Sequence, residues 1–338
     1  MTSLRVLLVT SWQTPCGIAE YAAQLEESVE AADPGIEVYP SAACLDPDTD
    51  AALGAYQLVH LNHHDALHSG WQPDHVQALV DTGVPVVVTY HDTRDTLAAC
   101  PKLEALAAVA SAVIVHEPVE GLEGSRIHYW RQGVPAAAQR PAEYNHLVTP
   151  TGGWRDGEGR YYLTPWKAFP QQPVLGTCGF NFPWKNFDRI AQETEKVGWA
   201  CVICSTNATE ADEARWKGFN PSTLVVRGHL PTPVLVNYLA GCDATAFMYE
   251  CANTGTSGAI RMGIAARKPV IAFRGCRQFR DLRNESALTF IHTWDMFHAA
   301  LVDYLLCGPG QLVELAHRDS WTVRGRQHAD LYRSLVHP

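Results

Sequence analysis

The stretch that decides the fold runs from residue 244 to residue 273 and reads ATAFMYECANTGTSGAIRMGIAARKPVIAF. A short apolar run comes first, a loop rich in glycine and hydroxyl residues follows, and apolar residues at helical spacing lead to a second apolar run. This pattern predicts a strand that ends near Tyr249, a turn, and a helix that begins near Thr256. Because the first N–H groups of a helix have no partner within it, the turn is a candidate anion-binding site.

The same alternation of strand and helix extends along the whole chain. Ten short runs are rich in Val, Ile and Leu and apolar on both faces, as strands of a parallel sheet with helices on each side must be. The predicted strands are 4–10, 56–62, 84–90, 112–115, 174–178, 200–204, 223–226, 244–248, 269–273 and 287–291. Helical spacing recurs between them, for example over 18–29 and 295–305. We therefore predict an α/β protein with doubly wound sheets.

The middle of the chain interrupts this alternation. Residues 135–173 are rich in Pro, Gly and Arg, have weak periodicity, and are expected to include a small hairpin at 160–163. A length of 338 residues corresponds to about two domains. We therefore predict two Rossmann-like halves with a cleft between the carboxyl ends of their sheets, which is where such folds bind ligands.

The composition excludes several classes of protein. The chain is 46% hydrophobic and 18% charged, as globular domains are. Its formal net charge of −10 disfavours bulk binding to nucleic acid or anionic membranes, and no run reaches the roughly 18 apolar residues of a membrane span. Ten scattered cysteines and no leader-peptide cleavage pattern predict a cytoplasmic protein with reduced thiols. Cys201 and Cys204 fall in one strand and point to opposite faces, which disfavours a shared metal or a disulfide.

Two loops of the second half carry candidate phosphate and sugar ligands. The segment 176–186, GTCGFNFPWKN, follows a predicted strand, and its Lys185 can place a positive charge on a phosphate group. Glu250 precedes the glycine-rich turn, where a carboxylate suits the hydroxyls of a sugar or a ribose. The alternatives are a solvated lysine and an ordinary helix cap at Thr254 or Thr256.

Polar residues also follow the strands of the first half. Asn62, His63 and His64 stand at the end of the second predicted strand, and His91 and Asp92 follow the third. Structural hydrogen bonding is the alternative role for these histidines. A metal site is not expected, because the histidine spacing crosses from strand to loop and no further ligands complete a set. The first turn lacks the Gly-x-Gly-x-x-Gly fingerprint, which argues against a dinucleotide-dependent oxidoreductase.

Together these features resemble the GT-B glycosyltransferases, in particular the retaining, nucleotide-sugar-dependent group (family four) that includes glycogen-synthase-like and mannosyltransferase members. Gly17 matches the first-turn glycine that lies against the donor diphosphate in that family. His91 ends a Val-Val-Thr-Tyr-His segment similar to the one that carries the family's sugar-binding histidine. Lys185 matches the phosphate lysine, and Glu250 matches the first glutamate of a Glu-x7-Glu element.

The resemblance implies a metal-independent glycosyltransferase that uses a nucleotide-diphosphate sugar, no further cofactor and an unidentified acceptor, with retention. It implies an acceptor domain at 1–140, an interdomain passage at 141–172, a donor domain at 173–319 and a C-terminal helix at 320–338 that crosses back to the first domain. The alternatives are a nucleotide-sugar epimerase or hydrolase, and a non-catalytic sugar-nucleotide-binding protein. Phe180 stands where the family has an arginine, and Gly258 where it has the second glutamate.

The resemblance also implies roles for individual residues. The implied catalytic residues are His91, Lys185 and Glu250. The implied donor-binding residues are Gly17, Phe180, Asn181, Gly255, Thr256, Ser257 and Gly258. The implied acceptor-binding residues are Asn62, His63, His64 and Asp92.

Overall fold

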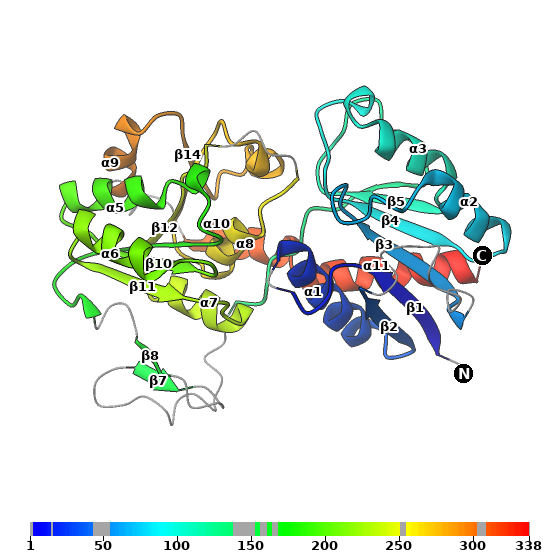
Figure 1. Ribbon diagram of the computed structural model, residues 1–338, viewed down its shortest axis with the longest axis horizontal. Coiled ribbons are helices and arrows are strands. Elements are labelled where there is room, and N and C mark those ends of the chain that lie inside the picture. The colour runs from blue at the N-terminus through cyan, green and yellow to red at the C-terminus, as the bar shows by residue number, and fades with distance from the viewer. Residues whose placement is uncertain are drawn as a thin grey trace. The chain divides into compact units, whose positions relative to one another are not determined.

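The computed structural model describes residues 3–14, 16–42, 55–137, 153–155, 161–163, 168–250, 255–302 and 309–337. These residues form two compact units, each with a six-stranded sheet of its own (Figure 1). The first unit comprises the described residues within Met1–Gly133, Asn253–Gly258 and Asp319–Pro338. The second unit comprises those within Val134–Ala252 and Ala259–Arg318.

Six parallel strands form the sheet of the first unit in the order β2-β1-β3-β4-β5-β6. The strands are β1 (Leu4–Val9), β2 (Ile36–Ser41), β3 (Leu58–His63), β4 (Val86–Tyr90), β5 (Ala112–Val115) and β6 (Ile127–Tyr129). The helices are α1 (Gly17–Ala32), α2 (Pro73–Asp81), η4 (Leu97–Ala99), α3 (Pro101–Val109) and α11 (Trp321–Val336). The chain moves outward from β1 on one side and from β3 on the other. Right-handed crossovers therefore place α1 on one face and α2 with α3 on the opposite face.

Alternate residues of the central strands of this sheet enter two separate cores. Val6 and Leu8 of β1 belong to the core that also contains apolar residues of α1 and α11. Leu7 and Val9 of the same strand belong to the core that contains residues of α2 and α3. Because side chains alternate along a strand, the sheet is buried on both faces, which explains why its central strands show no alternation of polar and apolar residues.

The C-terminal helix α11 packs against α1 in the first unit (Figure 1). Gly325 allows the two backbones to approach closely, because a Cβ atom at this position would collide with the main chain of Ser28. Near the other end of α11, the Nε atom of Arg333 lies 2.9 Å from a carboxylate oxygen of Asp33. These contacts hold the last helix of the chain against the first.

The second unit repeats the doubly wound arrangement with the strand order β11-β10-β9-β12-β13-β14, again all parallel. The strands are β9 (Val174–Cys178), β10 (Ala200–Ser205), β11 (Thr223–Arg227), β12 (Ala244–Phe247), β13 (Val270–Phe273) and β14 (Thr289–Ile291). The helices are η6 (Pro183–Lys185), α5 (Phe187–Lys196), α6 (Glu210–Phe219), α7 (Thr232–Ala240), α8 (Gly258–Ala265), η7 (Arg277–Leu282), α9 (Asp295–Val302) and α10 (Pro309–Arg318).

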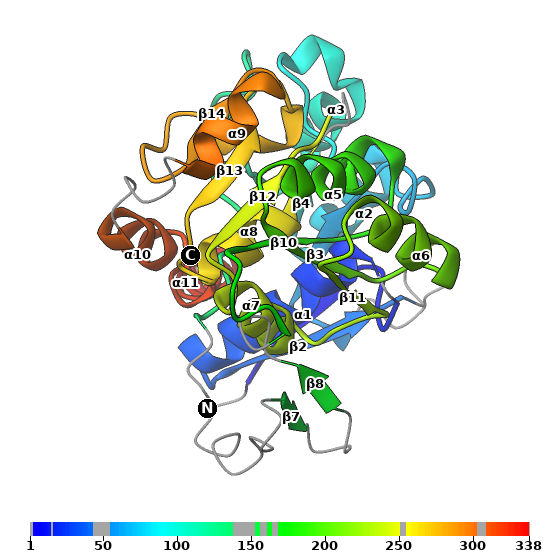
Figure 2. The same cartoon turned by 90° about the vertical axis from the view of Figure 1, so that its left-hand side faces the viewer.

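The helices of the second unit cover both faces of its sheet. Figure 2 shows α5 and α6 on one side of strands β10 to β13 and α7 and α8 on the other, as right-handed crossovers in two directions require. A small hairpin also belongs to this unit, in which β7 (Gly153–Arg155) pairs antiparallel with β8 (Tyr161–Leu163). The hairpin expected at 160–163 is therefore confirmed for its described residues.

The predicted fold class is confirmed, since both halves are doubly wound parallel sheets. All ten predicted strands are present, with ends that differ by at most two residues. Two strands at sheet edges, β2 and β6, were not predicted. The helix expected from Thr256 begins at Gly258, and the alternative cap residue Thr254 lies outside the described residues. None of the described helices is long and apolar enough to cross a membrane.

Candidate functional site

In the second unit, the chain leaves two neighbouring strands in opposite directions. These strands are β9 and β12, because β10 lies beyond β9 on one side and β13 lies beyond β12 on the other. Ligands of doubly wound sheets bind at the carboxyl ends of such a strand pair, because the loops that follow the two strands diverge to opposite faces. Lys185 follows β9 and Glu250 follows β12. Both residues therefore lie at the position where this fold binds ligands.

The ammonium group of Lys185 is enclosed by aromatic rings. Lys185 ends the short helix η6, and only 6% of the residue is exposed. Its Nζ atom lies 4.9 Å from the ring centre of Tyr249 and 5.3 Å from that of Trp184. The ring centre of Phe180 lies 6.0 Å away. Aromatic faces attract a cation, and exclusion of water strengthens the field of its charge at short range.

The exposed residue Glu250 is joined to the same loop. Its backbone N–H donates a hydrogen bond to the carbonyl oxygen of Trp184 at 2.8 Å. Its carboxylate accepts a hydrogen bond from the indole N–H of Trp294 at 2.9 Å, and the guanidinium of Arg189 lies 4.5 Å from the centre of the Trp294 ring. A carboxylate is thus oriented at the end of β12 while the residue stays accessible to solvent.

The loop between β9 and Lys185 carries a row of stacked rings. The ring centres of Phe180 and Phe182 are 6.0 Å apart, and those of Phe182 and Trp184 are 5.5 Å apart. Phe182 nevertheless remains 43% exposed. The backbone N–H of Asn181 donates to the side-chain carbonyl of Asn207 at 2.5 Å, which fixes the main chain between the rings. Phe180, at the position of the family's arginine, therefore contributes to the enclosure of the lysine.

In the first unit, the strands that the chain leaves in opposite directions are β1 and β3. Gly17 follows β1 as the first residue of α1, and a Cβ atom built on it would meet no other atom within 4 Å. The thiol of Cys16 caps this helix by accepting a hydrogen bond from the backbone N–H of Ala19 at 3.3 Å. Asn62 and His63 are the last two residues of β3. The structure therefore brings Gly17 and the end of β3 to the same edge of the sheet.

His91 follows β4 and is held by its neighbours on several sides. Its backbone N–H donates to the carbonyl oxygen of His63 at 3.0 Å, and its Nε2 atom is hydrogen-bonded to Oδ1 of Asn62. The ring centre lies 4.8 Å from that of Tyr21 and 5.1 Å from that of His116. Burial lowers the pKa of His91 well below its ordinary value, and the neighbouring His116 lowers it further. His91 is therefore a neutral imidazole near neutral pH.

Two residues of the glycine-rich turn, Gly255 and Ser257, belong to the first unit. Gly255 lies against His91, and Ser257 is buried. Gly255 has a φ angle of +81°, and a Cβ atom on it would collide with the carbonyl oxygen of His91. Ser257 is only 6% exposed. Only glycine fits at position 255, since an L residue would be strained there and would displace the histidine.

The turn residue Thr256 contacts Gln132, a glutamine that the sequence analysis did not select. The hydroxyl of Thr256 donates to the side-chain carbonyl of Gln132 at 3.1 Å. A Cβ atom at Gly258 would lie 3.3 Å from Nε2 of the same glutamine. The Gln132 amide therefore occupies the space next to the position where the family has its second glutamate.

The four residues expected to contact an acceptor divide into two pairs. Asn62 and His63 are both fully buried, so their side chains present no surface to an acceptor. The side chains of His64 and Asp92 are 35% and 15% exposed, and His64 Nε2 lies 3.5 Å from a carboxylate oxygen of Asp92. Asp65 accepts a hydrogen bond from His63 at 3.0 Å, which holds the pKa of its carboxyl group below the ordinary value.

The part of the chain that the structure describes contains no cluster suited to a metal ion. No group of three or more His, Cys, Asp or Glu residues there could hold a metal ion. The thiols of Cys201 and Cys204 are buried in β10 without a disulfide. Burial raises the pKa of the Cys201 thiol to about 12, so it stays protonated and is a poor metal ligand.

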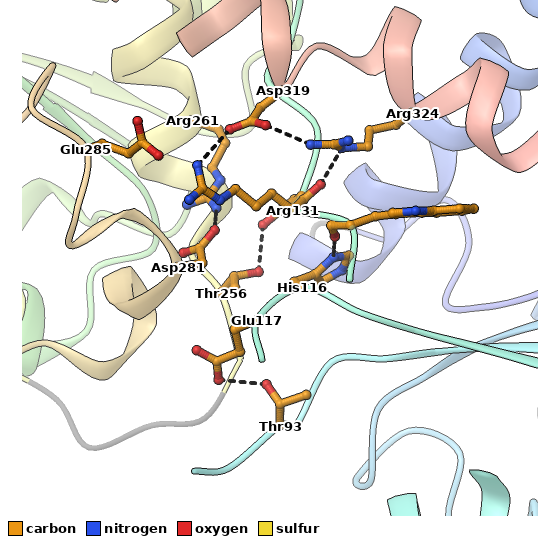
Figure 3. Close-up of polar contacts among 12 residues, drawn as sticks. Thr93, His116, Glu117, Arg131, Thr256, Arg261, Asp281, Glu285, Asp319 and Arg324 are labelled. Atoms are coloured by element: carbon orange, nitrogen blue, oxygen red, sulfur yellow. Dashed lines mark hydrogen bonds and ion pairs between the residues drawn. The ribbon is translucent and has the colours of Figure 1, made fainter. Parts of the chain in front are cut away.

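His116 and Glu117 are further candidates at the same sheet edge, directly after β5 (Figure 3). The Nδ1 atom of His116 donates to the carbonyl oxygen of Trp130 at 2.8 Å. Glu117 accepts a hydrogen bond from the hydroxyl of Thr93 at 2.8 Å and is only 1% exposed. The sequence contains the signal for both residues, because polar residues directly after a correctly predicted strand are the pattern that identified His91.

Comparisons with known proteins show the fold class. No family model and no curated protein sequence matches the chain. A glycosyltransferase from Rickettsia africae has a TM-score of 0.67 and 12% identity, with 100% of both chains covered. HepE from Anabaena, solved in complex with UDP-glucose, has a TM-score of 0.64 and 12% identity over 98% of this chain and 99% of its own. Sucrose-phosphate synthase from Thermosynechococcus elongatus has a TM-score of 0.64 and 14% identity over the same shares.

The chain therefore has the GT-B fold, in which two Rossmann-like units are joined in one chain. This result confirms the resemblance drawn from Gly17, His91, Lys185 and Glu250 at the level of the fold. Identities of 12–14% carry no further conclusion about the reaction, since one fold hosts many activities.

Proposed function

We propose that this protein is a glycosyltransferase that moves a sugar from a nucleotide-diphosphate sugar to an acceptor, with retention of the anomeric configuration. The observation that carries this proposal is the pairing of Lys185 and Glu250 at the carboxyl ends of β9 and β12, where a doubly wound sheet binds ligands. The hydrogen bond from Glu250 N–H to the carbonyl of Trp184 ties the two loops together. HepE, which shares the fold, was solved with UDP-glucose, and we propose a UDP-sugar as the first donor to test.

In the proposed reaction, the bond between the anomeric carbon and the β-phosphate oxygen breaks. A bond from that carbon to an acceptor oxygen forms, and the proton of the acceptor leaves with the nucleoside diphosphate. Negative charge therefore grows on the leaving phosphate. The Lys185 ammonium, held by three rings and shielded from water, stabilises that charge without needing to reorganise. We propose that the backbone amides of residues 255–257 assist it, with no metal ion.

The two remaining catalytic residues are assigned to the donor sugar. Glu250 keeps one carboxylate oxygen on the Trp294 indole, and its other oxygen accepts hydrogen bonds from sugar hydroxyls. His91 contacts the sugar as a neutral imidazole. For the acceptor, the partly exposed pair of His64 and Asp92 replaces the four-residue set, because the other two members are buried.

The test measures nucleotide release from a panel of UDP-, GDP-, ADP- and CDP-sugars, with the anomeric configuration of the product read by NMR. The substitution Lys185→Met keeps a similar shape and removes the charge, and we expect the turnover rate to fall about 100- to 1,000-fold. The matched control is Lys217→Met, because Lys217 is 48% exposed and pairs with Glu213 along its own helix. EDTA should leave the rate unchanged.

Three outcomes would count against the proposal. Equal turnover by Lys185→Met and Lys217→Met would remove the lysine from the reaction. Conversion of the donor to an epimer without transfer would indicate an epimerase. Tight binding of a nucleotide sugar with no turnover across many acceptors would indicate a binding protein.

A further inference from the structure

The buried side chain of Asn62 has only one possible orientation. Its Nδ2 atom lies 3.4 Å from the carbonyl oxygen of Ile18 and 3.0 Å from the hydroxyl oxygen of Thr10. A carbonyl oxygen can only accept a hydrogen bond, and the Thr10 hydroxyl donates its own proton to the carbonyl of Ser11 at 3.2 Å. Both neighbours therefore require a donor, so the amide nitrogen faces them and the amide oxygen faces away.

The amide oxygen of Asn62 faces Nε2 of His91, the atom to which it is hydrogen-bonded. Because this oxygen can only accept, Nε2 must carry a proton. A neutral imidazole has one ring proton, so Nδ1 of His91 is left with a lone pair. Among the described residues, no side chain or main-chain group donates a hydrogen bond to that Nδ1 atom.

We propose that Asn62 is a positioning residue that fixes His91 as the Nε2–H tautomer, so that Nδ1 accepts a hydrogen bond from a hydroxyl of the donor sugar. This inference rests on the proposed function and deepens it, because it specifies the chemistry of the contact. A bare lone pair attracts a hydroxyl or an ammonium group and repels a phosphate or carboxylate oxygen. The histidine is thus assigned to the sugar, and the phosphates are left to Lys185.

The surroundings of His91 keep the ring neutral. Tyr21 on α1 and His116 after β5 pack against the ring. His63, His64 and His68, at or after the end of β3, add unfavourable charge interactions whenever they are protonated. None of these neighbours is a carboxylate that would stabilise an imidazolium. The neutral tautomer therefore persists as the pH is lowered from 8 to 6.

The first test reads the tautomer directly from the full-length protein. Histidine ring nitrogens labelled with 15N are observed by NMR at pH 7.5, and the His91 signals are identified by their loss in His91→Gln. We expect Nε2 to have the shift of a protonated nitrogen and Nδ1 that of a bare one. In Asn62→Ala, the chemical shifts of both nitrogens should move toward the average of the protonated and unprotonated values. A protonated Nδ1 in the unsubstituted protein would overturn the proposal, whatever reaction the protein catalyses.

The second test adds ligands to the same sample. UDP-glucose should shift the His91 Nδ1 signal in the direction of an accepted hydrogen bond, whereas UDP alone should leave it unchanged. A shift of equal size with UDP alone would overturn the assignment to the sugar. If neither ligand binds, the panel of donors identifies the nucleotide first. The first test therefore separates failure of this inference from failure of the proposed function.

The third test uses the pH dependence of donor binding. Asn62→Asp places a carboxylate against His91 and should raise the pH at which the ring takes up a proton by one unit or more. As the pH is lowered from 8, the KM for the donor should therefore begin to rise at a higher pH in Asn62→Asp than in the unsubstituted enzyme. Asn220→Asp is the matched control, because Asn220 is equally buried and donates to Thr194 and Trp199 in the second unit. Identical KM profiles in Asn62→Asp and the unsubstituted enzyme, down to the lowest pH at which both stay folded, would contradict the inference.

Discussion

Replacing Gly17 with alanine separates the proposed role of this residue in donor binding from any role in the fold. Gly17 is the first residue of α1, its φ angle is not positive, and a Cβ atom there would meet nothing within 4 Å. The methyl group therefore costs the folded state nothing, and it reduces the conformational freedom of the unfolded chain. We expect Gly17→Ala to raise the free energy of unfolding by about 0.4–1 kcal/mol.

The same methyl group would stand between the backbone and a donor diphosphate. If the diphosphate approaches the first turn as proposed, we expect kcat/KM for the donor to fall about 10- to 100-fold, which is about 1.4–2.7 kcal/mol of lost transition-state stabilisation. The assay pairs thermal or urea unfolding with initial rates of nucleotide release. A more stable variant with unchanged kcat/KM would refute the placement of Gly17 at the donor. A less stable variant would refute the argument from open space.

The control for this experiment is Gly255→Ala, where the two effects should not separate. The φ angle of +81° costs an alanine about 1–2 kcal/mol, and its Cβ atom would also press on the carbonyl oxygen of His91. We therefore expect a loss of both stability and activity. Full activity in Gly255→Ala would mean that the turn does not need its observed conformation.

Three further outcomes follow from contacts away from Gly17. Burial lowers the pKa of His68 and of His328 to about 3. Protons therefore bind the unfolded chain more strongly, and stability is full above about pH 6.5 and falls by up to about 1.4 kcal/mol per pH unit per histidine below it. Urea titrations from pH 7.5 to 5 should show this slope, reduced in His328→Gln. Asp281→Asn, which removes the carboxylate charge from the buried ion pair between Asp281 and Arg261 of α8, should cost about 3–5 kcal/mol of unfolding free energy, and an unchanged urea midpoint would contradict it. Trp294→Phe should raise KM for the donor more than it lowers kcat, because it frees the Glu250 carboxylate, and unchanged kinetics would mean that this hydrogen bond does not orient it.

The accuracy of the sequence-based strand prediction has a physical cause. Central strands of a doubly wound sheet are buried on both faces, so each must be a continuous apolar run, and each of the ten runs is a strand. The two missed strands, β2 and β6, form the two opposite edges of the first sheet, and both are partly exposed. An edge strand has one neighbour and less burial, so Pro40 and Glu37 are tolerated in β2 and the apolar signal is lost.

The loops at the strand ends were also predictable from the sequence, whereas the partners of their side chains were not. His91 directly follows an apolar run, Glu250 and Lys185 stand in the loops after two others, and parallel strands bring such ends to one edge of a sheet. The ring of Tyr249 at Lys185 and the indole of Trp294 at Glu250 come from distant parts of the chain. The strand order β9-β12-β13-β14 brings these groups within reach of each other.

The sequence by itself determined the class of fold and the positions of the candidate residues, because burial on both faces of a sheet and turns at its edge leave a local pattern. The tertiary structure decided what those residues can do. Asn62 and His63 are residue types that could bind an acceptor, but both side chains are fully buried. The Asn62 amide is instead hydrogen-bonded to His91 and orients its ring. The orientation of the Asn62 amide depends on acceptor oxygens of Ile18 and Thr10. These three residues come from separate segments that are adjacent only in the folded chain, so no local sequence pattern predicts the contact.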